Sequence, residues 1–139
     1  MLKSGFTLAL VVAQRLIRRI CKNCRESVTP NARILNPSNL GVLQRQGVLR
    51  KTHGGLAGVR LYNGKGCAQC QGSGFIGRVG LFEIFEVDED IRDLIMQRKP
   101  ASFIRSTAIM KGMKTMFQDG LAKAFMGETT IEEVFRVAL

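Results

Sequence analysis

Two Cys-x-x-Cys pairs constrain this chain more than any other feature of its sequence. Cys21-Lys-Asn-Cys24 and Cys67-Ala-Gln-Cys70 contain all four cysteines of the 139 residues. A gap of two residues lets both sulfurs of a tight turn converge on one ion, and two such turns supply the four ligands of tetrahedral Zn²⁺. Four protein ligands leave no position open for water. The pattern therefore predicts a closed, structural zinc site at Cys21, Cys24, Cys67 and Cys70.

Other uses of four cysteines remain open at this point. Two disulfides would need an oxidising compartment, and a disulfide within Cys-x-x-Cys is strained and usually redox-active. A thioredoxin-like site normally needs one such pair beside a βαβ pattern, which the sequence does not show. Iron, alone or in an iron-sulfur cluster, uses the same ligands, and sequence discriminates poorly between iron and zinc. His53, the single histidine, lies in a glycine-rich loop and is interpreted as a solvated residue, not as a ligand.

The charge divides the chain into two parts. Residues 1–83 hold 13 Lys and Arg against two Glu, a net +11, whereas residues 84–139 hold eight against nine acidic residues, a net −1. The composition as a whole, 45% hydrophobic and 23% charged, is that of a globular domain. We therefore expect a basic, metal-bearing part, a near-neutral part and a boundary near residue 84.

The apolar spacing before the first Cys pair predicts one amphipathic helix over 6–20, which leads into Cys21. Residues 25–65 are rich in Gly and Pro, with a short helix expected from Ser38 to about Gln46. Val59 and Leu61 indicate a strand that leads to the second pair.

After the second pair the pattern changes from strand to helix. A strand is expected over 75–87, and four helices should follow, over 89–98, 103–111, 115–126 and from about 131. The expected caps are Asp88, Ser102, and a capping box of Thr130 with Glu133. The methionines of this part are interpreted as core, with an adaptable interaction surface as the alternative; they are Met96, Met110, Met113, Met116 and Met126. The fold class is therefore α+β and mostly helical: a tetracysteine zinc subdomain with a short β element, followed by a small helical bundle.

The sequence contains no constellation that would make this chain an enzyme by itself. No Gly-x-x-x-x-Gly-Lys-Ser/Thr loop is present to bind phosphates, and no Ser/His/Asp or paired-carboxylate pattern stands out. We expect no catalytic residue and no cofactor-binding residue besides the metal ligands.

Three blocks of sequence, in order, carry a family resemblance. They are Ala13-Gln-Arg-Leu-Ile-Arg-Arg-Ile-Cys-Lys-Asn-Cys24, then Gly66-Cys-Ala-Gln-Cys-Gln-Gly-Ser-Gly-Phe-Ile-Gly-Arg-Val-Gly-Leu-Phe-Glu83, then Asp119-Gly-Leu-Ala-Lys123 before Gly127-Glu-Thr-Thr-Ile-Glu-Glu133. Together they closely resemble the C-terminal portion of the ATPases that drive type II secretion and type IV pilus assembly. The resemblance covers about residues 9–139, and only the loop at 30–60 is loosely fitted.

The resemblance implies a division of the chain and a set of partners. Residues 1–20 would be the terminal helix of an ATPase core truncated after its phosphate-binding loop, 21–84 the zinc subdomain and 85–139 the helical subdomain. Such ATPases are cytoplasmic hexamers at the inner face of the inner membrane. ATP and Mg²⁺ would bind only the full-length protein. The implied partners are the rest of the core, neighbouring protomers and inner-membrane platform proteins, through which membrane association would be peripheral. Arg78 and Glu83 are candidates for an interdomain or intersubunit ion pair, with solvated charges at a strand edge as the alternative.

A second class of function remains open beside the resemblance. Cys67-x-x-Cys-x-Gly-x-Gly74 also matches the zinc repeat of DnaJ-type chaperones, although those proteins repeat the unit four times and Cys21-x-x-Cys24 lacks the glycines. A basic zinc module could also act as a nucleic-acid-binding adaptor. Nucleic acid is not the expected partner, because aromatic residues are scarce in the basic part.

Overall fold

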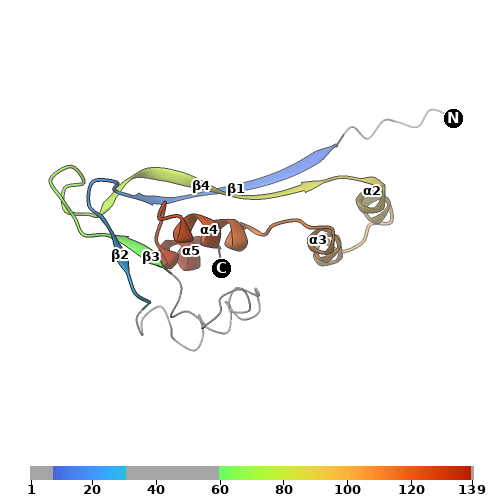
Figure 1. Cartoon of the computed structure of the whole chain (residues 1–139). Coiled ribbons are helices and arrows are strands. Elements are labelled where there is room, and N and C mark those ends of the chain that lie inside the picture. Colours follow the sequence, from blue (N-terminus) through green and yellow to red (C-terminus); the bar gives the residue numbers. More distant parts are fainter. Residues whose placement is uncertain (1–7, 31–59, 139) are drawn as a thin grey trace.

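The computed structural model describes residues 8–30 and 60–138, which form a long two-stranded ribbon, a second short sheet and a set of helices (Figure 1). The ribbon pairs β1 (Leu10–Ile20) with β4 (Phe75–Glu86) in antiparallel orientation. The second sheet pairs β2 (Arg25–Val28) with β3 (Leu61–Gly64), also antiparallel. The turn that follows β1 carries Cys21 and Cys24, and the turn that precedes β4 carries Cys67 and Cys70.

Four described helices follow the ribbon, and they are α2 (Glu89–Met96), α3 (Ala101–Met110), α4 (Met116–Phe125) and α5 (Ile131–Ala138). In Figure 1, α4 and α5 lie below the middle of the ribbon and α2 and α3 lie at its far end, away from β2 and β3. None of these helices is both long and apolar enough to cross a membrane.

The helix expected over 6–20 is wrong, because residues 10–20 form the strand β1. The segment Leu-Val-Val-Ala-Gln-Arg-Leu-Ile-Arg-Arg-Ile is apolar enough to fit a helical period and also a strand with two apolar faces, so periodicity does not separate the two. Pairing with the twelve-residue β4 decides the outcome, since β-branched residues pack well on a pleated surface. The α+β class is confirmed, with more strand and less helix than expected.

The expected strand over 75–87 and the helices after it are confirmed to within a few residues. Asp88 caps α2 by accepting a hydrogen bond from the Ile91 N–H, as predicted. The predicted N-cap of α3, Ser102, is wrong, because Pro100 is the N-cap and no side chain caps the helix. Thr130 does accept a hydrogen bond from the Glu133 N–H.

The interior of the described chain consists of two apolar clusters. The larger one joins β1, β3 and β4 to α4 and α5, and its buried members are Ile17, Leu61, Leu81, Phe117, Leu121, Ala124, Ile131 and Val134. The smaller one joins the end of β4 to α2 and α3 through Val87, Ile91, Ala108 and Met113. The larger cluster takes side chains from both sides of residue 84, while the division into parts at that residue stays a prediction.

Several expectations lie outside the described residues. The short helix from Ser38 to Gln46, Val59 of the expected strand and His53 all fall within 31–59. The strand that Leu61 indicates is β3.

Candidate metal centre

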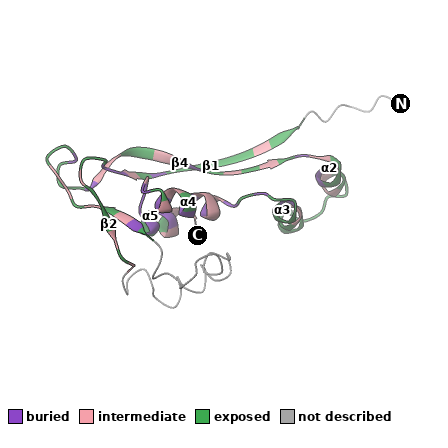
Figure 2. Ribbon diagram, viewed as in Figure 1, coloured by how far each residue is buried: buried purple, intermediate pink, exposed green. Residues whose placement is uncertain are grey.

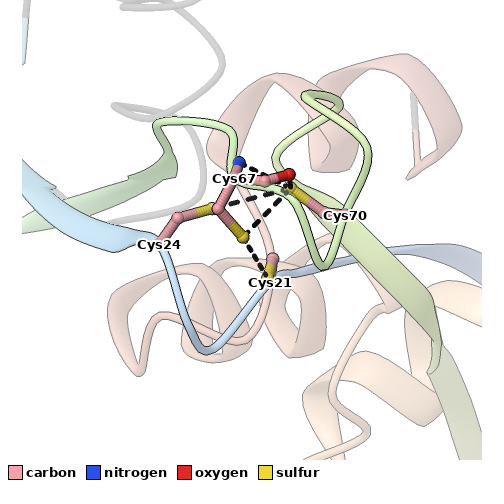
Figure 3. Close-up of side chains that lie close together, drawn as sticks. All are labelled: Cys21, Cys24, Cys67 and Cys70. Carbon is pink, nitrogen blue, oxygen red and sulfur yellow. Dashed lines mark hydrogen bonds between the residues drawn. The ribbon is translucent and has the colours of Figure 1, made fainter.

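The two Cys-x-x-Cys turns meet at the joint between the two sheets (Figure 3). Cys21 directly follows β1 and Cys24 directly precedes β2, so the first turn links the ribbon to the short sheet. Cys67 and Cys70 lie in the turn that leads from β3 back to β4. The four cysteines, predicted as one site, are thus brought together by four strand ends.

The four sulfurs are spaced as ligands of one ion. All lie within 4.8 Å of one another, and the Sγ atoms of Cys21 and Cys67 and of Cys24 and Cys70 are each 3.8 Å apart. A tetrahedral ion with metal–sulfur bonds of about 2.3 Å would place neighbouring sulfurs roughly 3.8 Å apart. A disulfide would need about 2.05 Å, and all four cysteines are free thiols in this structure. The donor set therefore fits a thiolate-bound metal ion and not a pair of disulfides.

Hydrogen-bond donors surround the sulfurs. The Gly66 N–H donates to the Cys24 sulfur (3.3 Å), and the N–H groups of Cys67 and Gly74 donate to the Cys70 sulfur (3.1 and 3.3 Å). The Asn23 amide nitrogen lies 3.3 Å from the Cys67 sulfur. Such donors stabilise negative charge on sulfur, which metal ligation requires.

The pKa values of the thiols are not all shifted in the same direction. Hydrogen bonding from Asn23 is the largest effect on Cys67 and lowers the pKa of its thiol to about 6, whereas burial raises the pKa of Cys24 to about 12. Four thiolates this close repel one another, so they cannot all ionise without a cation between them. A divalent ion would supply that compensation.

Glycines make the close approach of the two strand ends possible. A Cβ atom on Gly64 would lie 2.0 Å from the carbonyl oxygen of Gly74, and one on Gly74 would lie 2.5 Å from that of Gly64. Gly74 also has φ = 75°, a left-handed conformation that residues with side chains rarely adopt. Gly72 and Gly77 also have positive φ, and a Cβ atom on Gly80 would lie 2.7 Å from the Phe82 ring.

The connection between α4 and α5 lies against the first Cys turn. The Ile20 N–H donates to the Glu128 carbonyl (2.9 Å), and the Thr129 hydroxyl donates to the Arg18 carbonyl (2.8 Å). Arg25 donates to the Gly127 carbonyl (3.2 Å). The terminal helices are therefore attached to the same joint that holds the cysteines.

A second polar feature lies on the ribbon, where three arginines line a hollow of about 530 Å³. They are Arg18, Arg78 and Arg136, and Arg18 pairs directly with Arg78 across the two strands. Glu133 is buried beside them and accepts hydrogen bonds from Arg18 (2.6 Å) and Arg136 (2.7 Å). Burial alone would raise the pKa of Glu133, but the bonds from Arg136 and Arg18 lower it to about 2. Three guanidinium groups against one carboxylate leave the hollow positively charged.

The residues expected to form an interdomain or intersubunit ion pair have different surroundings. Glu83 binds Arg105 of α3 and also accepts a hydrogen bond from the Met116 N–H (3.1 Å). Arg78 has no ion-pair partner among residues 8–30 and 60–138. The place of Asn23 between two cysteines is the one signal that could have marked it as a sulfur partner, and no local pattern marks Glu133 as the partner of Arg18.

Comparison with known proteins shows what this chain is similar to. A sequence model of the family described as "Type II/IV secretion system protein" matches residues 1–136. The chain is 41% identical over 124 residues to the "Type IV pilus assembly ATPase PilB" of Thermus thermophilus, which covers 89% of this chain and 13% of that protein. It is 36% identical over 129 residues to the "Type II secretion system protein E" of Dickeya dadantii, covering 91% of this chain and 22% of that protein.

A third relative matches almost the whole chain. The "Protein transport protein HofB homolog" of Escherichia coli is 32% identical over 137 residues, which is 99% of this chain and 26% of that protein. The chain thus spans between about an eighth and about a quarter of the length of these relatives.

Proposed function

We propose that this chain, which belongs to the type II/IV secretion system protein family with its secretion and pilus assembly ATPases, is an interaction segment of such a motor. A zinc ion would cross-link this segment. The four sulfurs at the joint between two sheets carry this proposal. The ion, held by Cys21, Cys24, Cys67 and Cys70, would be structural zinc. Its chemistry would be to cross-link two turns that are distant in sequence, with no position open for a reaction.

The apolar outer face of the ribbon supports a role within a larger protein. Paired residues of an antiparallel ladder share a face, and one face carries the exposed side chains of Val12 and Ile84, which are direct partners. Leu10, Leu16 and Phe82 are exposed as well. Figure 2 shows exposed residues along much of both strands of the ribbon. A contiguous apolar face of this kind marks an interaction surface. The proposed occupant is the rest of the ATPase core.

The arginine hollow supports contact with a neighbouring protomer. Arg78 lies beside Arg18 and Arg136 and has no ion-pair partner in the described part of the chain, so an acidic group from another subunit would be attracted there. In a hexameric motor at the inner face of the inner membrane, such a contact would hold this segment against its neighbour. Platform proteins of the membrane would be further partners, and we propose no nucleic acid among them.

ATP hydrolysis is assigned to the longer protein and not to this chain. The 139 residues contain no phosphate-binding loop of the Gly-x-x-x-x-Gly-Lys-Ser/Thr type. ATP and Mg²⁺ would bind elsewhere in the full-length ATPase. The alternative of an independent basic zinc module has less support, because the family match runs through both Cys pairs and the helices after them.

Metal analysis of two variants tests the proposal. Cys24→Ser removes one of the four ligands, and Ser27→Ala, on the exposed part of β2 three residues away, is the matched control. Protein purified under reducing conditions should contain about one zinc per chain, by plasma mass spectrometry, in the wild type and the control. Cys24→Ser should lose the ion and most of its cooperative melting. Wild-type protein without a bound transition metal, or iron in place of zinc, would overturn the assignment.

A further inference from the structure

The solvent-facing side of α3 is apolar. Phe103 is 52% exposed, Ile109 40% and Met110 79%. A helix on the surface of a globular protein normally turns charged residues to water and apolar ones to the core. The outward side of α3 does not follow that rule.

Helical spacing shows which residues share this side. The core contacts of α3 are made by Ile104 and Ala108, four residues apart and therefore on one face. With 100° per residue, the opposite arc holds two serines and three apolar residues, which are Ser102, Phe103, Ser106, Ile109 and Met110. We call these five residues the α3 surface. It contains no charged side chain, and its serines are small enough to let another helix approach.

Cations without a described ion-pair partner lie on both sides of α3 along the chain. From Leu94 to Gln118 the chain has five cations and no acidic residue. Arg105 is paired with Glu83, and Lys111 with Asp88 and Asp90. For the other three, Arg98, Lys99 and Lys114, no described carboxylate lies within ion-pair distance.

We propose that the α3 surface docks an acidic amphipathic helix of a partner protein. An apolar stripe on that helix would pack between Phe103 and Met110, and carboxylates beside the stripe would face Lys99 and Lys114. This inference rests on the proposed role as an interaction segment and adds to it the chemistry of the partner. Charge complementarity selects this occupant, because Arg98, Lys99 and Lys114 flank α3 in the chain and no described carboxylate lies within ion-pair distance of them.

Two other occupants fit less well. A second copy of this chain would bring the same cations to the contact, at a net charge of +10 per copy. An anionic membrane would accept the cations, but two of the five residues of the α3 surface are serines, and α3 spans only ten residues. Both occupants are outcomes of the test.

The test uses two synthetic helical peptides of about 18 residues, which is roughly 27 Å of helix. Each has leucines along one face, and the flanking positions are glutamate in the first peptide and lysine in the second. Amide chemical shifts of the ¹⁵N-labelled 139-residue chain locate the contact during titration. The acidic peptide should change the amide chemical shifts of α3 and of the residues next to it. It should bind at least about tenfold more tightly than the lysine peptide, and its binding should weaken as salt increases.

Variants separate the α3 surface from general stickiness. Phe103→Ser with Met110→Ser should weaken binding of the acidic peptide at least about tenfold. Val12→Ser is the matched control, because Val12 is also 52% exposed but lies on the ribbon. Equal binding of both peptides, or shifts outside α3, would overturn the proposal. Two other results would also overturn the proposal if the peptide does not bind. They are dimerisation of the chain, or its binding to vesicles of phosphatidylcholine and phosphatidylglycerol, when the double variant abolishes that association. Zinc content is measured on the same samples. A chain that holds zinc but does not bind the peptide contradicts the docking proposal alone, and the proposed zinc site is unaffected.

Discussion

The buried carboxylate of Glu133 provides the sharpest test of how β1 is joined to α5. Its side chain is 3% exposed and binds the guanidinium groups of Arg18 and Arg136. The lowering of its pKa from 4.5 to about 2 corresponds to about 3 kcal/mol of folding stability. Both arginine side chains are more than half exposed, so screening by solvent reduces this to roughly 1 to 2 kcal/mol.

Glu133→Gln keeps the shape of the side chain and removes its charge. We expect the variant to lose about 1 to 2 kcal/mol at pH 7, because two arginines are left beside a neutral group. A carboxyl whose pKa is lower in the folded state stabilises the fold above the pKa of the unfolded state and ceases to do so as pH falls through the folded value. The difference between wild type and variant should therefore shrink between about pH 4.5 and pH 2.

Urea unfolding followed by circular dichroism, repeated at several pH values, measures this difference. Glu132→Gln is the control, since Glu132 is the exposed neighbour on the same helix. Loss of metal in acid affects all three proteins alike and cancels in the comparison. Equal stability of the two variants at pH 7 would refute the reasoning, as would a difference that persists unchanged to pH 2.

Three further predictions concern the joint and the core. Gly64→Ala should prevent native packing of the second Cys turn, because its Cβ would overlap the Gly74 carbonyl, and metal content after purification should fall. Leu81→Ala, at a side chain with no exposed surface, should cost about 2 to 5 kcal/mol in urea unfolding; a cost below about 1 kcal/mol would contradict the assigned core. Chelation should increase amide hydrogen exchange in β2, β3 and the α4–α5 connection more than in α2 and α3, and uniform loss of protection would contradict this.

The cysteine cluster and the family were predictable from sequence because their signals are local. Two-residue gaps set the geometry of each Cys turn, and the sequence blocks around them lie in an order that the family match confirms. The start of α2 was predictable for the same reason, since Asp88 sits where an N-cap must be. The identity of the bound ion stays a prediction, because zinc and iron take the same thiolates.

The strand β1 and the Glu133 contacts were not predictable, because both depend on distant partners. Arg18 and Glu133 are 115 residues apart in the chain, and no local pattern relates them. The segment of β1 satisfies a helical apolar period, and only the presence of β4 beside it makes the extended form the stable one. The exposed outer side of α3 was missed in the same way, since the helical pattern did not show which of its apolar residues the core would leave uncovered.

The position of the cysteines explains why this chain would depend on a metal ion. Two-stranded sheets are marginally stable in water, and the described part of the chain contains two of them, joined end to end at the cysteines. The larger cluster packs α4 and α5 on one face of the ribbon, but β2 contributes only Val28 to it, and only at its edge. The short sheet is therefore held by the Cys turns, by the contacts of Leu61 and Val28 with the core and by the bond from Arg25 to Gly127. An ion at the joint would fix the angle between the two sheets. Because the α4–α5 connection binds Ile20 and Arg18 beside that joint, the ion would also fix where the terminal helices lie on the ribbon.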